Sequence, residues 1–187
     1  VDTDTRTDLP GLYVAGEDAG GAHGSNRLGG NGVANSTVYG GVAGDVMGQD
    51  CQEMKALHDP DETVLDEELT RAMTPFSQKP GDVTALRNRL QDVMWEDVGV
   101  MRDADGLQRG LKRIAEIDDE FSSVGVAADN LAFNLSWHDW LNLRSLIDMS
   151  MVIAKAALSR ENSRGAHFRE DFPDAGAMQE SYFTLAS

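Results

Sequence analysis

The fold is indicated most directly by a glycine-rich stretch near the N-terminus, GLYVAGEDAGGAHGSNRLGGN at residues 11–31. It opens with a short apolar run at residues 12–15, bounded by glycines, and this pattern predicts a buried strand. A loop over 18–30 follows, and residues 31–57 then predict a helix that carries several small residues. A strand, a glycine loop and a helix N-terminus together bind anions well, because backbone N–H groups and the helix dipole point at the ligand.

The loop matches neither of the two common nucleotide-binding patterns. It has no Gly-Lys-Ser/Thr, which excludes a P-loop, and no clean G-x-G-x-x-G after the strand, which excludes the first dinucleotide-binding turn. The helix after it contains glycines such as Gly40 and Gly44, and each costs roughly 1 kcal/mol against alanine. Such glycines indicate that another backbone or a flat ligand comes close to this helix.

Residues 80–170 have a different composition, rich in Leu, Arg, Asp and Met at helical spacing. Asp82 is the expected N-cap of a first helix, and the spacing predicts two more, over about 107–121 and 137–162. The apolar positions expected to face inward are Val83, Leu86, Leu90, Val93, Leu107, Leu111, Ile114, Ile117, Phe121, Leu143, Leu146, Ile147, Ala154, Ala157 and Leu158. Three such helices predict a bundle. The expected fold is therefore α+β but mainly α, with a strand–loop–helix segment ahead of a helical domain.

Composition narrows the function. A formal net charge of −16 repels phosphate backbones, so no nucleic-acid partner is expected. No apolar run approaches the ~20 residues that span a bilayer, so no direct membrane insertion is expected. One cysteine and four scattered histidines show no metal-ligand spacing, and the cysteine count agrees with a cytoplasmic protein. Because Val1 is not Met and no signal-peptide pattern follows it, the chain is expected to begin within a longer sequence or after processing, and the first is favoured.

Three stretches carry a resemblance to a known family. Residues 11–17 (GLYVAGE) and 23–31 (HGSNRLGGN) closely resemble the second FAD-contacting segment of succinate dehydrogenase and fumarate reductase flavoproteins. Residues 160–173 (RENSRGAHFREDFP) look like the family's C-terminal Ser-Arg-Gly-Ala-His signature, and residues 95–100 (WEDVGV) resemble part of its helical domain. The matches stand in the family's order and are spread over most of the chain.

The resemblance implies a domain division and a set of site residues. Residues 1–58 would end an FAD-binding domain, 59–79 would be a linker with one short helix, and 80–187 would form the flavoprotein C-terminal helical domain. Glu17 matches the acidic residue that binds the FAD ribityl hydroxyls, and Asn31, Gly32 and Val33 match the start of the helix that points at the flavin ring. Arg27 matches the arginine that binds a substrate carboxylate, for which its planar fork is suited. Relatives commonly have Ser at position 32 and Leu-Leu at 33–34, so the subfamily stays open.

The histidines and the C-terminal signature have less definite roles. His23 is expected to be structural rather than substrate-binding, since the family's substrate-binding histidine lies upstream of this chain. Arg164 and His167 are expected either to orient the substrate loop or to hold the helical domain on the FAD domain, and the second is favoured. No metal site is expected.

The resemblance implies that the complete protein transfers hydride between FAD and a C4 dicarboxylate, succinate or fumarate. The family's proton-donor arginine and first FAD-binding motif are not in these residues, so no catalytic residue is expected here and the fragment alone is expected to be inactive. Its expected place is the cytoplasm, attached peripherally to the inner face of a membrane through partners such as an iron–sulfur subunit. Two alternatives stay open: another superfamily oxidase such as L-aspartate oxidase, or a non-catalytic helical module that docks a partner.

Overall fold

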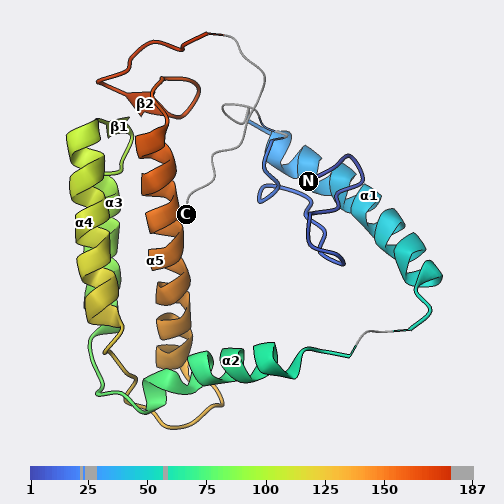
Figure 1. Ribbon diagram of the computed structural model, residues 1–187, viewed down its shortest axis with the longest axis horizontal. Helices are drawn as coiled ribbons and strands as arrows, with labels where there is room; N and C mark the ends of the chain where they lie inside the picture. Colours follow the sequence, from blue (N-terminus) through green and yellow to red (C-terminus); the bar gives the residue numbers. More distant parts are fainter. Residues whose placement is uncertain (22, 24–28, 57–58, 178–187) are drawn as a thin grey trace. The chain divides into compact units, whose positions relative to one another are not determined.

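The computed structural model describes residues 1–21, 23, 29–56 and 59–177 (Figure 1). The chain divides into two compact units, an N-terminal unit, Val1–Pro60, and a C-terminal unit, Asp61–Ser187. Most of the described secondary structure is helical, and this confirms the predicted fold class. None of the helices in the described ranges is long and apolar enough to cross a lipid bilayer.

The N-terminal unit is one long helix with an extended segment packed on it. Helix α1, Asn31–Glu53, begins where it was predicted and ends earlier than residue 57, because the backbone turns extended at Met54. The segment before it is tied to the helix by Asp50, which accepts hydrogen bonds from the Arg6 guanidinium (Nη2–Oδ1, 2.8 Å) and from the Tyr13 hydroxyl. An ion pair and a phenol therefore fix the first residues to α1.

The predicted strand at residues 12–15 does not form. Tyr13 makes a single antiparallel bridge with Arg6, and Leu12 is 48% exposed rather than buried. A buried strand needs neighbours on both edges, and in the described part of this unit only the segment around Arg6 pairs with it. Residues 12–15 are thus an apolar run, but the described part of this unit has no sheet in which they could form a buried strand.

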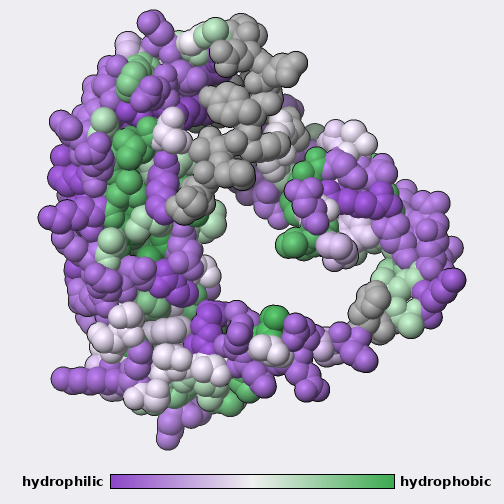
Figure 2. All heavy atoms as spheres, in the orientation of Figure 1, coloured by the Kyte–Doolittle hydropathy of each residue, from purple (hydrophilic) through white to green (hydrophobic). Residues whose placement is uncertain are grey.

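The C-terminal unit is a three-helix bundle with a helical extension at its start. Figure 1 shows α3, α4 and α5 side by side, and Figure 2 shows a strip of hydrophobic residues along the bundle between hydrophilic ones. Its elements are α2, Glu62–Met73; the 3-10 turn η1, Thr74–Phe76; α3, Val83–Glu96; β1, Met101–Arg102; α4, Ala104–Phe121; α5, Leu135–Ser159; and β2, Phe168–Arg169. The two short strands pair in parallel, Met101 beside Phe168 and Arg102 beside Arg169.

Side-chain caps and a shared apolar core explain the bundle. Asp82 accepts from the Ala85 N–H (2.9 Å), which confirms its predicted capping role, and Asp103 and Asn134 cap α4 and α5 in the same way. The core consists of Leu86, Leu90, Val93, Val98, Leu107, Ile114, Ile117, Phe121, Val126, Trp140, Leu143, Ile147, Ala154 and Ala157. Most positions predicted to face inward are therefore buried.

Leu146 is the clear exception among the predicted core positions. It is 43% exposed, while Leu143 and Ile147 on the same helix are buried. The buried positions of α5 recur every three or four residues, and residue 146 falls beside that stripe rather than on it. α5 also runs from 135 to 159 instead of 137 to 162, because Asn134 caps it early and Arg160 is extended.

Candidate functional site

The start of α1 forms one wall of an open hollow of about 380 Å³. Its lining comes from the glycine-rich loop and the first turns of the helix: Glu17, Gly29, Gly30, Gly32, Val33 and Ser36. Three of the four predicted cofactor-binding residues, Glu17, Gly32 and Val33, therefore lie together. Asn31 lines the neighbouring hollow, of about 300 Å³, with His23. The predicted substrate-binding residue Arg27 lies outside the described residues.

The N-terminus of α1 differs from that of every other described α-helix. Its N-cap residue is Gly30, whose left-handed backbone (φ 86°) favours glycine, and no described side chain caps the helix. The other four have an aspartate or asparagine cap: Asp61, Asp82, Asp103 and Asn134. The first N–H groups of α1 are thus available to a ligand, and no acidic side chain in the first turn opposes a negative one. This donor set fits an electron-rich or anionic group.

A buried amide positions the loop over the helix. Asn35 is buried, and its Nδ2 donates to the carbonyl oxygen of Gly16 at 3.0 Å and lies 3.2 Å from Nε2 of His23. Gly16 has φ 123°, and a Cβ there would lie 2.9 Å from Oγ of Ser36, so this close approach needs glycine. Together these contacts place Glu17 at the rim of the hollow. Sequence reasoning missed Asn35, although its spacing of four from Asn31 puts it on the same face of α1.

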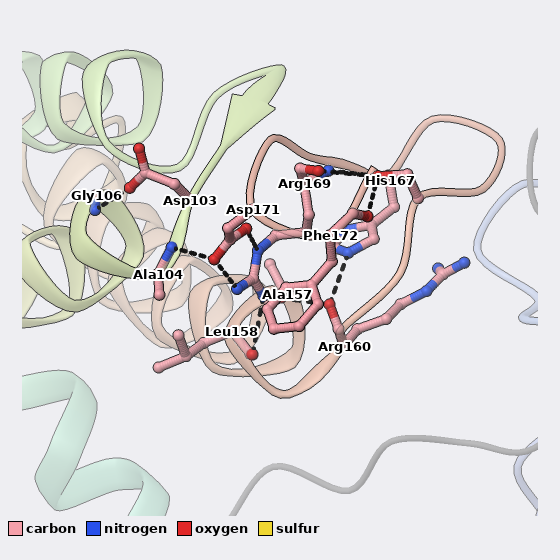
Figure 3. Close-up of polar contacts among 11 residues, drawn as sticks. Asp103, Ala104, Gly106, Ala157, Leu158, Arg160, His167, Arg169, Asp171 and Phe172 are labelled. Atoms are coloured by element: carbon pink, nitrogen blue, oxygen red, sulfur yellow. Dashed lines mark hydrogen bonds and ion pairs between the residues drawn. The ribbon is translucent and has the colours of Figure 1, made fainter. Parts of the chain in front are cut away.

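A second polar cluster lies at the C-terminal end of α5 (Figure 3). Arg169 is only 1% exposed, and its Nη1 donates to the carbonyl oxygens of Ala157 (3.0 Å), Leu158 (3.0 Å) and Arg160 (3.2 Å). Its Nε and Nη2 bind both oxygens of Asp171 at 2.7 Å. Arg169 therefore satisfies the free carbonyls at the negative end of α5 while it holds a carboxylate.

Asp171 extends this cluster to α4. Its Oδ2 accepts from the N–H of Ala104, the first residue of α4, at 3.0 Å, and the Arg169 guanidinium lowers the Asp171 pKa to about 2. The ends of two helices are thus linked through one ion pair, in which the guanidinium is buried and the carboxylate is partly exposed. Both residues belong to the C-terminal signature, and the sequence alone indicates no role for either.

His167 joins the same turn to β1. Nδ1 of His167 lies 2.9 Å from Arg102 Nη1, which can only donate, so Nε2 carries the ring proton and donates to the carbonyl of Arg160 at 3.2 Å. Burial lowers the pKa of His167, and three nearby arginine charges add to the effect. Arg164 donates from Nη2 to the carbonyl of Ala175 (2.6 Å). These contacts lie within the C-terminal unit, and the expected contact with an FAD domain stays a prediction.

Acid is expected to weaken the C-terminal unit through His167. Because the pKa of His167 in the folded state lies below its ordinary value of 6.5, its contribution is fully present above about pH 6.5 and is lost as the pH falls through the folded-state pKa. We expect His167→Gln to remove this part of the pH dependence of the free energy of unfolding, measured by urea denaturation. His138→Gln, at an exposed position, should keep it. An unchanged pH profile in the His167 variant would show that His167 titrates normally.

In the part of the chain that the structure describes, no group of three or more His, Cys, Asp or Glu side chains is arranged so that it could hold a metal ion.

Comparison with known proteins finds a family match in each of the two units. Residues 87–187 match the family described as fumarate reductase flavoprotein C-term, and residues 1–33 match the FAD binding domain. The fumarate reductase flavoprotein subunit of Haemophilus influenzae is 29% identical over an alignment that covers 100% of this chain and 32% of that protein. The L-aspartate oxidase 1 of Ralstonia nicotianae is 35% identical over 175 residues, 90% of this chain and 30% of that protein.

Solved structures agree with the sequence matches. The Mycobacterium smegmatis Sdh1 in complex with UQ1 superposes with a TM-score of 0.87 at 34% identity, over 95% of this chain and 30% of that one. A quinol-fumarate reductase with menaquinol molecules gives a TM-score of 0.83 at 25% identity, over 95% and 32%. The chain thus spans roughly a third of the length of the relatives it matches.

Proposed function

Because the chain belongs to the succinate dehydrogenase/fumarate reductase flavoprotein family, we propose that it is part of an FAD-dependent oxidoreductase that acts on a C4 dicarboxylate. The observation that supports this most strongly is the uncapped N-terminus of α1, which opens on the hollow beside Glu17. When bound, FAD supplies the hydride chemistry at the C2–C3 bond of succinate or fumarate.

The residues of the hollow have distinct roles in this proposal. Glu17, an exposed acceptor at the rim, accepts hydrogen bonds from the ribityl hydroxyls. The N–H groups of Asn31, Gly32 and Val33 would donate to the flavin ring, and the positive end of the helix would favour negative charge on it. Gly32 lacks the hydroxyl that relatives commonly have, so the backbone alone provides these donors.

Substrate binding is assigned to Arg27 from its match to the family motif. A guanidinium binds a carboxylate through two parallel N–H···O bonds, which fixes the orientation of the substrate as well as its charge. The same proposal includes a location: the full-length protein is attached peripherally to the inner face of a membrane through other chains of a complex, one of which is an iron–sulfur partner subunit. The proposal also includes the domain division: an FAD-binding domain that ends at residue 58, a linker over 59–79 and a helical domain from residue 80.

L-aspartate oxidase is the second candidate, because a relative of 35% identity has that name. Aspartate oxidases usually have Ala-Ser where this chain has Gly29 and Gly30, and this difference favours the fumarate reductase type. Reduction of the flavin by L-aspartate but not by succinate would reverse the preference. The third alternative, a helical docking module, predicts a colourless full-length protein.

FAD binding is expected to depend on Glu17. Glu17→Ala removes charge-assisted hydrogen bonds worth about 1.5–3 kcal/mol, so FAD should bind the full-length apoprotein roughly 10- to 100-fold more weakly. Glu53→Ala, at the other end of α1, is the control and should bind FAD normally. The measurement is the quenching of flavin fluorescence on titration of the apoprotein. Equal affinity in both variants would remove Glu17 from the site.

A further inference from the structure

The arginines of the described chain differ in whether a carboxylate accompanies them. Those paired with Asp or Glu are Arg6, Arg71, Arg87, Arg89, Arg109, Arg113, Arg144 and Arg169. Within the described residues, Arg102, Arg160 and Arg164 have no such partner. Arg102 contacts His167 through its guanidinium, and Arg160 and Arg164 contact it through their backbones. This gathering stands out in a chain with 32 acidic and 16 basic residues, where carboxylates are plentiful.

Arg102 is held in place without a counter-charge. Its Nε donates to the carbonyl oxygens of Val98 (3.0 Å) and Gly99 (2.9 Å), and its Nη1 donates to His167. Burial lowers the Arg102 pKa, and the charge of Arg160 lowers it further. The guanidinium is therefore half-buried, fixed by neutral acceptors and repelled by a second cation. Such a group is stabilised by an anion that approaches from outside.

Arg160 supplies the second charge. Its backbone carbonyl is tied to His167 and Arg169, while its side chain makes one hydrogen bond, from Nε to Oδ1 of Asn162 (3.0 Å). Figure 3 shows its guanidinium extending away from the Arg169–Asp171 pair. Arg164 is linked to His167 by backbone hydrogen bonds of 2.9 and 3.3 Å, but its guanidinium donates to the carbonyl oxygen of Ala175 (2.6 Å) and is not counted in the site.

We propose that Arg102 and Arg160 form a carboxylate-binding site on the C-terminal unit. The ligand is a carboxylate because a fixed guanidinium fork matches its planar pair of oxygens, as Arg169 does with Asp171. The carboxylate comes either from a free small acid or from an Asp or Glu on a protein surface. The proposal uses neither Arg27 nor the proposed flavin chemistry.

The test follows the arginine Nε–H signals of the 187-residue chain by NMR during titration with succinate, and separately with a hexapeptide of Asp and Glu. Saturable shifts of Arg102 and Arg160 are expected with one or both carboxylates, and the tighter ligand identifies the source. Arg160→Gln should weaken binding at least tenfold, because it removes one cation while it leaves the backbone contacts of residue 160 intact. Arg71→Gln, which breaks an exposed pair with Glu68, should leave the affinity unchanged.

Three outcomes would overturn the proposal. If neither succinate nor the peptide shifts the Arg102 and Arg160 signals, no such site exists. If inorganic phosphate binds as tightly as the carboxylates, the arginines attract anions by charge alone. The titration is repeated with Arg27→Ala, which should not change it. Loss of binding in the Arg27→Ala variant would assign the carboxylate to the predicted substrate site. If binding persists but the flavin proposal fails, the carboxylate site is still supported.

Discussion

Arg169→Ala is expected to lower the free energy of unfolding of the C-terminal unit by about 2–3 kcal/mol, because each buried hydrogen-bonding group that is left unpaired costs about 1–3 kcal/mol. The change leaves the carbonyls of Ala157 and Leu158 without their donor and Asp171 without its cation. It also removes the connection between the end of α5 and the start of α4, because Asp171 is no longer held against the Ala104 N–H.

Urea denaturation followed by circular dichroism measures this loss. The matched control is Arg89→Ala, which breaks a pair with Glu120 whose side chains are both 50% exposed, and it should cost no more than about 1 kcal/mol. Equal destabilisation by the two substitutions would show that burial and helix capping add nothing to the Arg169 pair.

The helical core could be predicted from the sequence because its signals are local. Asp82 was identified as a cap from its position before an apolar stripe, and the stripe at Leu86, Leu90 and Val93 is buried as expected. Local patterns also located the start of α1 at Asn31. In each case the information lies within one or two helical turns of the residue concerned.

The remaining features depend on contacts between segments far apart in the chain. The strand predicted at 12–15 needs sheet partners, and a pattern of apolar residues does not reveal whether they exist. Arg169 was treated as part of a signature, because nothing in its neighbours indicates that it reaches back to Ala157 or that Asp171 reaches Ala104. Leu146 shows the same limit within a helix, since a helix rich in apolar residues has more than one candidate buried face.

Arg27→Ala is expected to slow the reoxidation of reduced flavin by fumarate about 100-fold or more in the full-length protein. Truncating one partner of a buried charged pair typically costs about 2–5 kcal/mol, and every 1.4 kcal/mol is a factor of ten. Arg27→Lys keeps the charge but loses the two-pronged geometry, so it should fall between the wild type and the alanine variant. FAD content is checked in each variant, so that loss of cofactor is not mistaken for loss of substrate binding. Equal rates in all three proteins would exclude Arg27 from substrate binding.

The most direct test of the proposed function is the wild-type reaction itself. The full-length protein is reduced with dithionite in the absence of oxygen, fumarate is added, and the flavin absorbance is followed. The proposal predicts rapid reoxidation that saturates with fumarate concentration. A flavin that stays reduced in the presence of fumarate would contradict it and direct attention to other electron acceptors.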